Sequence, residues 1–349
     1  MQTDNIKLLR SKKNKLSDYR ELNNLFVEER FYDFIERELL PNILISSKKF
    51  WIELSQIIEK FSPCNTSLLA QRDVLQRKID SWYITRNESE FDTDSYIRFL
   101  KDIDYLAPEN DPFIIKTNNV DYEVSQIAAP QLVVPVSNAR FAINACNARW
   151  GSLYDAVYGS DLFPNTGVKA SEQGYDSERG ALVIEYSFEF LDRAIPLEQA
   201  SHKNVENYFL ESSSNELSFK ARLNNGKIVS LKSRDKFIGF DEFDHATSYV
   251  FKNNDLHIEI TVNPCHAVGR TAPGNVSDIN IESAVSIILD CEDSVAAVDS
   301  EDKINVYQNC LELMRGSLSS TFIKSGNNFT RTLNEDRRYT SKKNESFYL

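Results

Sequence analysis

The sequence predicts an α/β protein, a partial β/α barrel of the TIM type with an N-terminal helical clasp and an inserted α/β domain that contains antiparallel strands. The N-terminal part carries apolar residues at helical spacing. Two short, apolar strands, at residues 131–136 and 283–290, are each followed by a helical segment. Such units are typical of a parallel sheet covered by helices. Between them, alternating apolar and polar residues indicate antiparallel hairpins, so we expect the barrel to be interrupted by an insertion.

The N-terminal helices are predicted in four segments. Residues 24–41 end at Pro41, and residues 47–61 carry an apolar stripe that ends before Ser62 and Pro63. Residues 66–87 and 95–106 follow. These stripes are best explained as core, and nothing in this part of the chain suggests chemistry.

The middle of the chain combines both kinds of element. Asn138 is a plausible N-cap for the helix that follows the first apolar strand. Another helix is predicted from the sequence SERGALVIEYSFEFLDRAIP. Residues 217–231 turn at Asn225 and Gly226, a strong hairpin signal, and residues 248–262 suggest a second hairpin. The second apolar strand then leads into a helix at 294–314, with an apolar stripe at Ile304, Tyr307, Leu311 and Met314.

The composition restricts the class of protein. The 349 residues, 41% of them hydrophobic, predict a globular chain of about two or three domains. A net charge of −12 argues against nucleic acid as a partner, although a few local arginines could still hold a small anion. The N-terminus has basic residues but no apolar core, so we do not expect a signal peptide, and no apolar run approaches the roughly 20 residues that a membrane helix needs. The five cysteines, without CxxC pairs, and four unpaired histidines argue against disulfides and zinc, so we expect a cytoplasmic protein.

Two carboxylates stand at the end of the second apolar strand. Asp290 and Glu292 point to the same side if the strand continues, and the carboxyl ends of parallel strands face the site in β/α proteins. Two carboxylates so near each other repel unless a divalent cation or an arginine lies between them. The alternative is a solvated acidic loop that favours the N-terminus of the next helix. Ser294 would open that helix and either cap it or donate to a ligand.

Arginines mark a second kind of candidate site. Arg140 lies about two residues inside a helix, where free N–H groups already favour a phosphate-bearing ligand. Arg331, Arg337 and Arg338 belong to a basic run that could bind a polyphosphate. In each case the alternative is a solvated surface arginine.

Several stretches together resemble the malate synthases, in their large monomeric G form. They are QLVVPVSNARFAINACNARWGSLYDAVYGSD, EQGYDSERGALVIEY, FKNNDLHIEI, VSDINIESAVSIILDCEDSVAAVDSEDK and LNEDRRYT. The resemblance covers nearly the whole chain from about residue 110 onward. It implies an interrupted β/α barrel that condenses acetyl-CoA with glyoxylate and water to give malate and CoA, with Mg²⁺ as cofactor. An aspartate would remove a proton from the acetyl methyl group, and an arginine would stabilise the enolate.

The resemblance also implies roles for residues of this chain. The acetyl-CoA contacts fall on Val133, Arg140, Phe141, Ser294 and Arg331. Asp290 and Glu292 match strand-end acids near the metal and the catalytic arginine, which they would support without binding the metal directly. The catalytic arginine, the general base and the metal ligands are expected beyond residue 349, so no metal ligand is expected in this chain.

We therefore expect an N-terminal portion of a malate synthase that is inactive alone. The expected domains are a clasp at 1–112, barrel segments at 113–149 and 282–315, and the inserted domain at 150–281 with its return at 316–349. Two alternatives remain open: a non-catalytic acyl-CoA-binding or interaction protein, and one half of a split enzyme whose barrel a separate C-terminal chain completes.

Overall fold

The computed structural model describes residues 18–85, 92–163, 175–213, 216–324 and 326–349. It forms two compact units, the first comprising residues 1–118 with 298–304 and the second residues 119–297 with 305–349. The predicted α/β class with antiparallel sheets is confirmed. No helix within the described ranges is long and apolar enough to cross a membrane.

The first unit begins with a hairpin that the sequence does not predict. Strands β1 (Tyr19–Leu22) and β2 (Leu25–Glu28) are joined by Asn23 and Asn24, whose φ angles of 44° and 66° suit a tight two-residue turn. The predicted helix from residue 24 is therefore wrong over its first residues. Helix α2 (Glu29–Phe34) begins after Glu28, whose carboxylate caps the helix by accepting a hydrogen bond from the N–H of Phe31. It continues through η2 (Ile35–Leu39) and η3 (Leu40–Asn42), and so ends close to the predicted Pro41.

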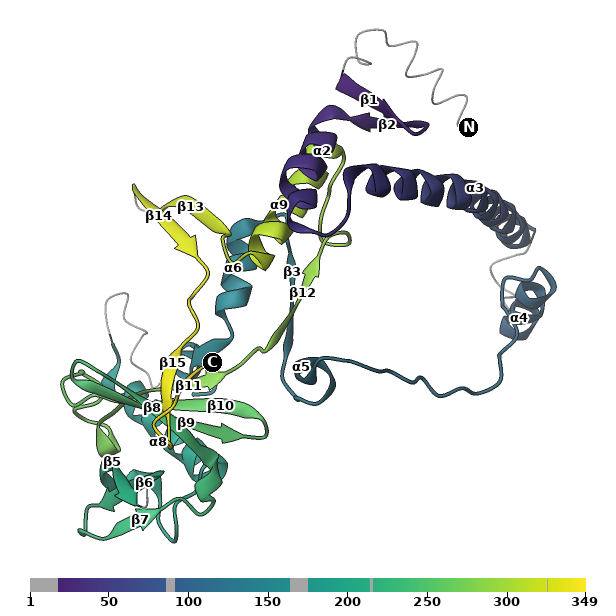
Figure 1. Cartoon of the computed structure of the whole chain (residues 1–349). Helices are drawn as coiled ribbons and strands as arrows, with labels where there is room; N and C mark the ends of the chain where they lie inside the picture. Colours follow the sequence, from purple (N-terminus) through teal and green to yellow (C-terminus); the bar gives the residue numbers. More distant parts are fainter. Residues whose placement is uncertain (1–17, 86–91, 164–174, 214–215, 325) are drawn as a thin grey trace. The chain divides into compact units, whose positions relative to one another are not determined.

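Helix α3 (Ser47–Ile84) is a single helix of 38 residues, drawn at its full length in Figure 1. The predicted break at Pro63 is wrong, because the helix continues through this residue. A proline removes one backbone hydrogen bond, and packing at the two ends of the helix outweighs that loss. Trp51 is buried near one end, and the Trp82 ring lies 4.6 Å from the ring of Tyr96 in helix α4 (Thr93–Asp102) near the other.

The second unit contains a pair of parallel strands. Strands β3 (Gln131–Pro135) and β12 (Ser286–Asp290) pair in parallel, and each is followed by a helix, α6 (Ala139–Asn147) and α9 (Ser300–Met314). Among the described strands this is the only parallel pairing, so a closed barrel remains a proposal. Helix α5 (Tyr122–Ser125) precedes the pair.

Helix α9 differs from its prediction in two respects. It begins at Ser300 and not at residue 294, and Tyr307 and Met314 of the predicted apolar stripe are 40% and 77% exposed. The buried residues are Val306 and Asn309. The Asn309 side-chain amide donates to the Val136 carbonyl at 2.9 Å, so a polar contact orients this helix against the strand ends.

A seven-stranded antiparallel sheet dominates the rest of the second unit. Figure 1 shows the yellow β15 beside the green β8, although these strands are far apart in the sequence. The predicted hairpin at 248–262 is confirmed as β9 and β10, with positive φ angles at Asn254 and Asp255. Helices α7 (Leu153–Gly159) and α8 (Ser177–Ala194) contribute to its apolar core. The strand order is β16 (Ser346–Tyr348), β15 (Arg338–Ser341), β8 (Phe237–Phe243), β9 (Ala246–Asn253), β10 (Leu256–Val262), β11 (Val276–Glu282) and β4 (Trp150–Ser152).

A smaller sheet of three strands joins the same core. The predicted turn at Asn225 and Gly226 is confirmed: the Gly226 N–H donates to the Leu223 carbonyl at 2.8 Å, and its φ of 82° favours glycine. The remaining elements are β5 (Val205–Ser213), β6 (Glu216–Leu223), β7 (Ile228–Ser230), the hairpin β13 (Ser319–Lys324) and β14 (Asn327–Thr332), and the 3-10 turns η5 (His202–Asn204), η6 (Arg234–Lys236) and η7 (Pro273–Asn275).

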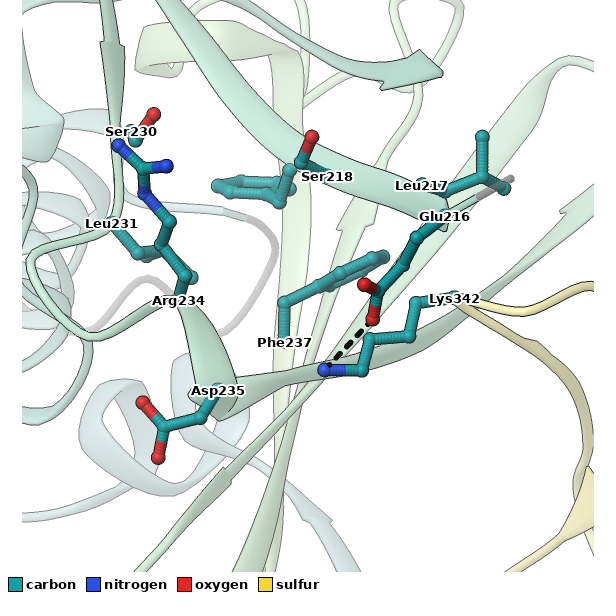
Figure 2. Close-up of a pocket in the computed structure, with 10 residues that line it drawn as sticks. Glu216, Leu217, Ser218, Ser230, Leu231, Arg234, Asp235, Phe237 and Lys342 are labelled. Carbon is teal, nitrogen blue, oxygen red and sulfur yellow. Dashed lines mark ion pairs between the residues drawn. The ribbon is translucent and has the colours of Figure 1, made fainter. Parts of the chain in front are cut away.

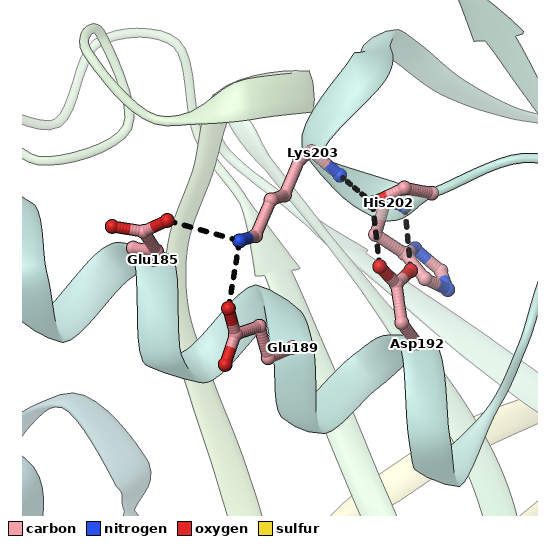
Figure 3. Close-up of polar contacts among 6 residues, drawn as sticks. Glu185, Glu189, Asp192, His202 and Lys203 are labelled. Carbon is pink, nitrogen blue, oxygen red and sulfur yellow. Dashed lines mark hydrogen bonds and ion pairs between the residues drawn. The ribbon is translucent and has the colours of Figure 1, made fainter.

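Polar side chains attach α8 to η5 and the start of the smaller sheet, as Figure 3 shows. The Asp192 carboxylate accepts the backbone N–H of His202 at 2.7 Å. The Lys203 ammonium lies 3.2 Å from Glu185 and 3.0 Å from Glu189. The exposed charges add little stability. The bond from the backbone of His202 to Asp192, in contrast, fixes the path of the chain as it leaves the helix.

Three short connections join α6, β12 and the β13–β14 hairpin to the seven-stranded sheet. They are residues 148–149, 283–285 and 333–337. The Ser283 hydroxyl donates to the Ala148 carbonyl at 2.7 Å, which links the first two connections. The Asn147 side chain donates to the Thr332 carbonyl at 3.0 Å and accepts from the Asn334 N–H at 2.8 Å. It therefore links the third connection to the end of α6.

Candidate functional site

The candidate site lies at the carboxyl edge of the parallel strand pair. Pro135 is the register partner of Asp290, and the Val136 N–H donates to the Asp290 carbonyl at 3.1 Å. Both strands therefore end at the same edge. The N-terminus of α6 and the loop after Asp290 begin there, as the strand–helix pattern predicts. Asn138 caps α6, as predicted, by accepting the N–H of Phe141 at 3.2 Å.

The Asp290 carboxylate organises its own loop. It accepts hydrogen bonds from the backbone N–H groups of Glu292 at 2.9 Å, Asp293 at 3.1 Å and Ser294 at 2.7 Å, and from the Ser294 hydroxyl at 2.6 Å. The bond from the Ser294 hydroxyl, followed by those from the backbone, lowers the pKa of Asp290 to about 2. The side chain is thus a fixed negative charge that holds the loop in one conformation.

Ser294 does not open the helix, so the prediction that it could be an N-cap is wrong. The Asp290 carboxylate captures this serine in the loop six residues before α9 begins. Asp299 caps α9 instead, accepting the N–H of Asp302 at 3.0 Å. The Ser294 hydroxyl donates its proton to Asp290, and its oxygen can still accept a hydrogen bond from a ligand.

The acidic pair does not form a cation site in the described residues. Glu292 is exposed, and the Asp290 oxygens are occupied by four donors of the protein. Across the described ranges, no group of three His, Cys, Asp or Glu side chains is arranged to hold a metal ion. The residues present therefore do not fit a magnesium site by themselves, and no chemical step is assigned to one.

Arg140 projects from the first turn of α6 toward strand β13. Its guanidinium lies 5.1 Å from the ring centre of Phe322 and 5.6 Å from that of Phe141. Cation–π contacts of this kind orient an arginine without consuming its hydrogen-bond donors. Arg140 is exposed and adjoins the free N–H groups of a nine-residue helix, so it can contribute to an anion site.

Arg331 lines a groove at the other end of α6. The groove has a volume of about 540 Å³ and is lined by Asn147, Phe322, Lys324, Asn327, Phe329, Thr330, Arg331, Thr332 and Asn334. Phe322 and Phe329 are register partners with ring centres 6.2 Å apart, and Arg331 is two residues along the same face. Phe322 therefore touches the Arg140 guanidinium and also lines the groove of Arg331.

Val133 and Phe141 present apolar surface near the strand ends. Val133 is 63% exposed on the face that alternation also gives to Ile288 and Asp290. Phe141 is 46% exposed on the first turn of α6. The structure thus places Asp290, Glu292 and Ser294 at the strand edge, with Val133 two residues before the end of β3. Arg140 contacts the hairpin that carries Arg331, and Phe141 lies next to Arg140 on the first turn of α6.

Sequence reasoning missed the groove around Arg331. Lys324, Phe322 and Asn147 were not among the candidates, because their proximity depends on a hairpin docking against a helix far away in the sequence. A local signal was present: Phe322 and Phe329 flank Gly326, whose φ of 81° suits a tight turn.

The family models and the related proteins that match this chain all belong to the malate synthases. Residues 30–93 match the model of the malate synthase N-terminal domain, and residues 175–254 match that of the malate synthase G alpha-beta insertion domain. The chain is 42% identical over 335 residues to malate synthase G of Halalkalibacterium halodurans, covering 96% of this chain and 45% of that protein. It is 42% identical over 311 residues to malate synthase G of Corynebacterium efficiens (89% and 41%) and 41% identical over 324 residues to that of Corynebacterium glutamicum (93% and 43%). The chain spans less than half the length of these relatives.

Proposed function

Because the chain belongs to the malate synthase G family through its N-terminal and insertion domains, we propose that it carries the acetyl-CoA-binding part of a malate synthase. The reaction of the complete enzyme would join acetyl-CoA to glyoxylate, with water, and release malate and CoA. The observation that carries this proposal is that Arg140, at the start of α6, contacts Phe322 of the hairpin that itself carries Arg331.

The proposed contacts divide between the charged and the uncharged parts of acetyl-CoA. Arg140, at a helix N-terminus, and Arg331, in a groove with Lys324, would hold the phosphates, which need fixed positive charge. Val133 and Phe141 expose apolar surface for the uncharged arm of the ligand. The Ser294 oxygen remains an acceptor at the strand edge.

Asp290 and Glu292 would support the reaction centre without exchanging protons with the substrate. A carboxylate whose pKa is lowered to about 2 stays ionised at neutral pH and is a poor general base. Its proposed role is to hold the loop and to orient an arginine by charge. Glu292, which is exposed on the same loop, is the better placed of the two to reach a neighbouring group.

The remaining features of the complete enzyme are proposals that follow from the family. They are a TIM-type barrel begun by β3 and β12, with domains divided at about residues 112, 149, 281 and 315, a monomeric state and a cytoplasmic location. Magnesium, which would polarise the aldehyde of glyoxylate, is proposed to bind through residues outside these 349.

Binding of CoA to the 349-residue chain tests the proposed site. Calorimetric titration should show binding that is weakened about tenfold or more by Arg140→Gln and by Arg331→Gln, because each removes a charge-assisted contact to phosphate. Arg222→Gln is the matched control, since Arg222 is an exposed arginine on β6. Equal CoA affinity in all four proteins would contradict the assignment of these arginines.

A further inference from the structure

The insertion domain contains a cavity that the proposed reaction does not use. It has a volume of about 330 Å³, which is at the lower end of the range for small-molecule sites. Its walls come from β6, β7, η6 and the residue after β15, as Figure 2 shows. The Leu217 N–H donates to the Lys342 carbonyl at 2.8 Å, so a backbone hydrogen bond closes one wall between distant parts of the chain.

The floor of the cavity is apolar and rigid. Phe219, Leu231 and Phe237 are only 2–3% exposed. The ring centres of Phe219 and Phe237 are 5.8 Å apart with an interplanar angle of 31°, and Figure 2 shows Phe237 in the middle of the view. These residues also belong to the main hydrophobic core, so the floor is formed before any ligand binds.

Two cationic side chains line the rim of the cavity, and one of them, Arg234, has only a weak contact with a carboxylate of the protein. The Lys342 ammonium is paired with Glu216 at 3.1 Å. The Arg234 guanidinium reaches Glu198 at 3.5 Å, the outer limit of a hydrogen bond, and its side chain is 70% exposed. In Figure 2 it lies on the opposite side of the floor from Lys342. Arg234 can therefore bind a carboxylate through two parallel N–H groups.

We propose that this cavity binds a small monocarboxylate with an apolar, preferably aromatic, body. The carboxylate would lie on Arg234 and the body against the small part of the Phe219 and Phe237 rings that the core leaves uncovered. Glu216 and Asp235 also line the cavity, and their negative charges oppose a second carboxylate on the ligand. The site is separate from the arginines proposed to bind acetyl-CoA, and its occupation does not depend on that proposal.

The test uses 3-phenylpropionate as the probe and the whole 349-residue chain. NMR titration should give binding with nuclear Overhauser contacts between the probe ring and the rings of Phe219 and Phe237. Arg234→Gln should weaken binding about tenfold, and Arg234→Lys should weaken it less because the charge is kept. The control Lys232→Gln changes an exposed cation two residues away that does not line the cavity, and should have no effect.

Three ligand controls define the chemistry. Acetate lacks the apolar body, 3-phenyl-1-propanol lacks the charge and phenylsuccinate carries a second carboxylate, so each should bind more weakly than 3-phenylpropionate. The proposal is overturned if 3-phenylpropionate does not bind, if Arg234→Gln binds it as well as the parent chain, or if the probe contacts residues elsewhere. Circular dichroism of the Arg234 variants establishes that they remain folded.

Discussion

At the scale of single residues, Asp290 shows how a side chain that resembles a catalytic acid is used for structure. A carboxylate at a strand end suggests proton transfer, yet four donors from its own loop surround it. The sequence predicts the position of this acid. It cannot predict the bonds, because they depend on the backbone torsions of residues 291–294.

His202 carries the pH dependence that we expect at this scale. Its ring is fully buried, with Nε2 at 2.9 Å from the Ile195 carbonyl and Nδ1 at 2.9 Å from the Tyr208 hydroxyl. The carbonyl can only accept, so Nε2 donates and Nδ1 accepts. Burial lowers the pKa of His202, so the unfolded chain binds a proton more readily than the folded one. The free energy of unfolding should therefore fall as the pH decreases below about 6.5, by up to about 1.4 kcal/mol per unit.

Urea unfolding between pH 7.5 and 5 measures this effect. The parent chain and the control His245→Gln, which changes an exposed histidine, should lose stability with similar steepness. His202→Gln should be less stable at pH 7.5 but less dependent on pH. An unchanged pH dependence in His202→Gln would assign the acid sensitivity to other groups.

At the scale of elements, the predictions succeed where local chemistry decides and fail where packing decides. The turn at Asn225 and Gly226 and the cap at Asn138 are local, and the structure has both. The break expected at Pro63 is absent because contacts at both ends of α3 maintain the helix. The start of α9 is displaced because Asp290 captures Ser294.

Replacing Pro63 tests the balance in α3. Pro63 is exposed and cannot donate to the carbonyl four residues earlier, so Pro63→Ala should stabilise the helix by up to about 3 kcal/mol. The thermal midpoint of the helical signal at 222 nm should rise. Asn65→Ala, at a nearby exposed position, controls for the general helix preference of alanine and should give a smaller rise. A midpoint lowered by Pro63→Ala would show that α3 depends on a distortion at the proline.

At the scale of the whole second unit, the seven-stranded sheet combines strands from both ends of this part of the chain. Strand β4 begins at Trp150, and β15 begins at Arg338. Glu259 in β10 secures the returning segment. It lies 3.0 Å from the Arg337 guanidinium and accepts a hydrogen bond from the Tyr339 hydroxyl. Glu259 is only 7% exposed, so the carboxylate is shielded from water, whereas the Arg337 side chain is 36% exposed.

Glu259→Gln should therefore destabilise the sheet by about 1–3 kcal/mol, because it leaves Arg337 without its nearby carboxylate. Trp150 reports the change, since the Arg337 guanidinium lies 4.6 Å from the centre of a Trp150 ring. Urea unfolding followed by tryptophan fluorescence gives the free energy. Glu242→Gln, an exposed change on β8, should be nearly neutral. If adding Arg337→Met to Glu259→Gln costs as much as it does in the parent chain, the pair is not coupled.

The residues of the candidate site come from the family resemblance and stay a prediction, and their arrangement could not be predicted from the sequence. The family resemblance assigns Arg140 and Arg331 to one ligand, and the strand–helix pattern places Arg140 at a helix start. Nothing local indicates that Phe322 would lie beside Arg140, because that contact requires a hairpin almost 200 residues later to dock on α6. Residues that come together only through tertiary packing produce no helical or strand periodicity in the sequence, so sequence patterns cannot reveal the contact.

The three connections that join α6, β12 and the β13–β14 hairpin to the large sheet determine how this unit can bend. A hinge works when one or two segments absorb the rotation through a few backbone torsions. Here the rotation would have to pass through three segments at once, and Ser283 and Asn147 tie each to a neighbour. A rotation of the large sheet would therefore have to break or stretch the hydrogen bonds of Ser283 and Asn147, which a two-segment hinge would leave intact.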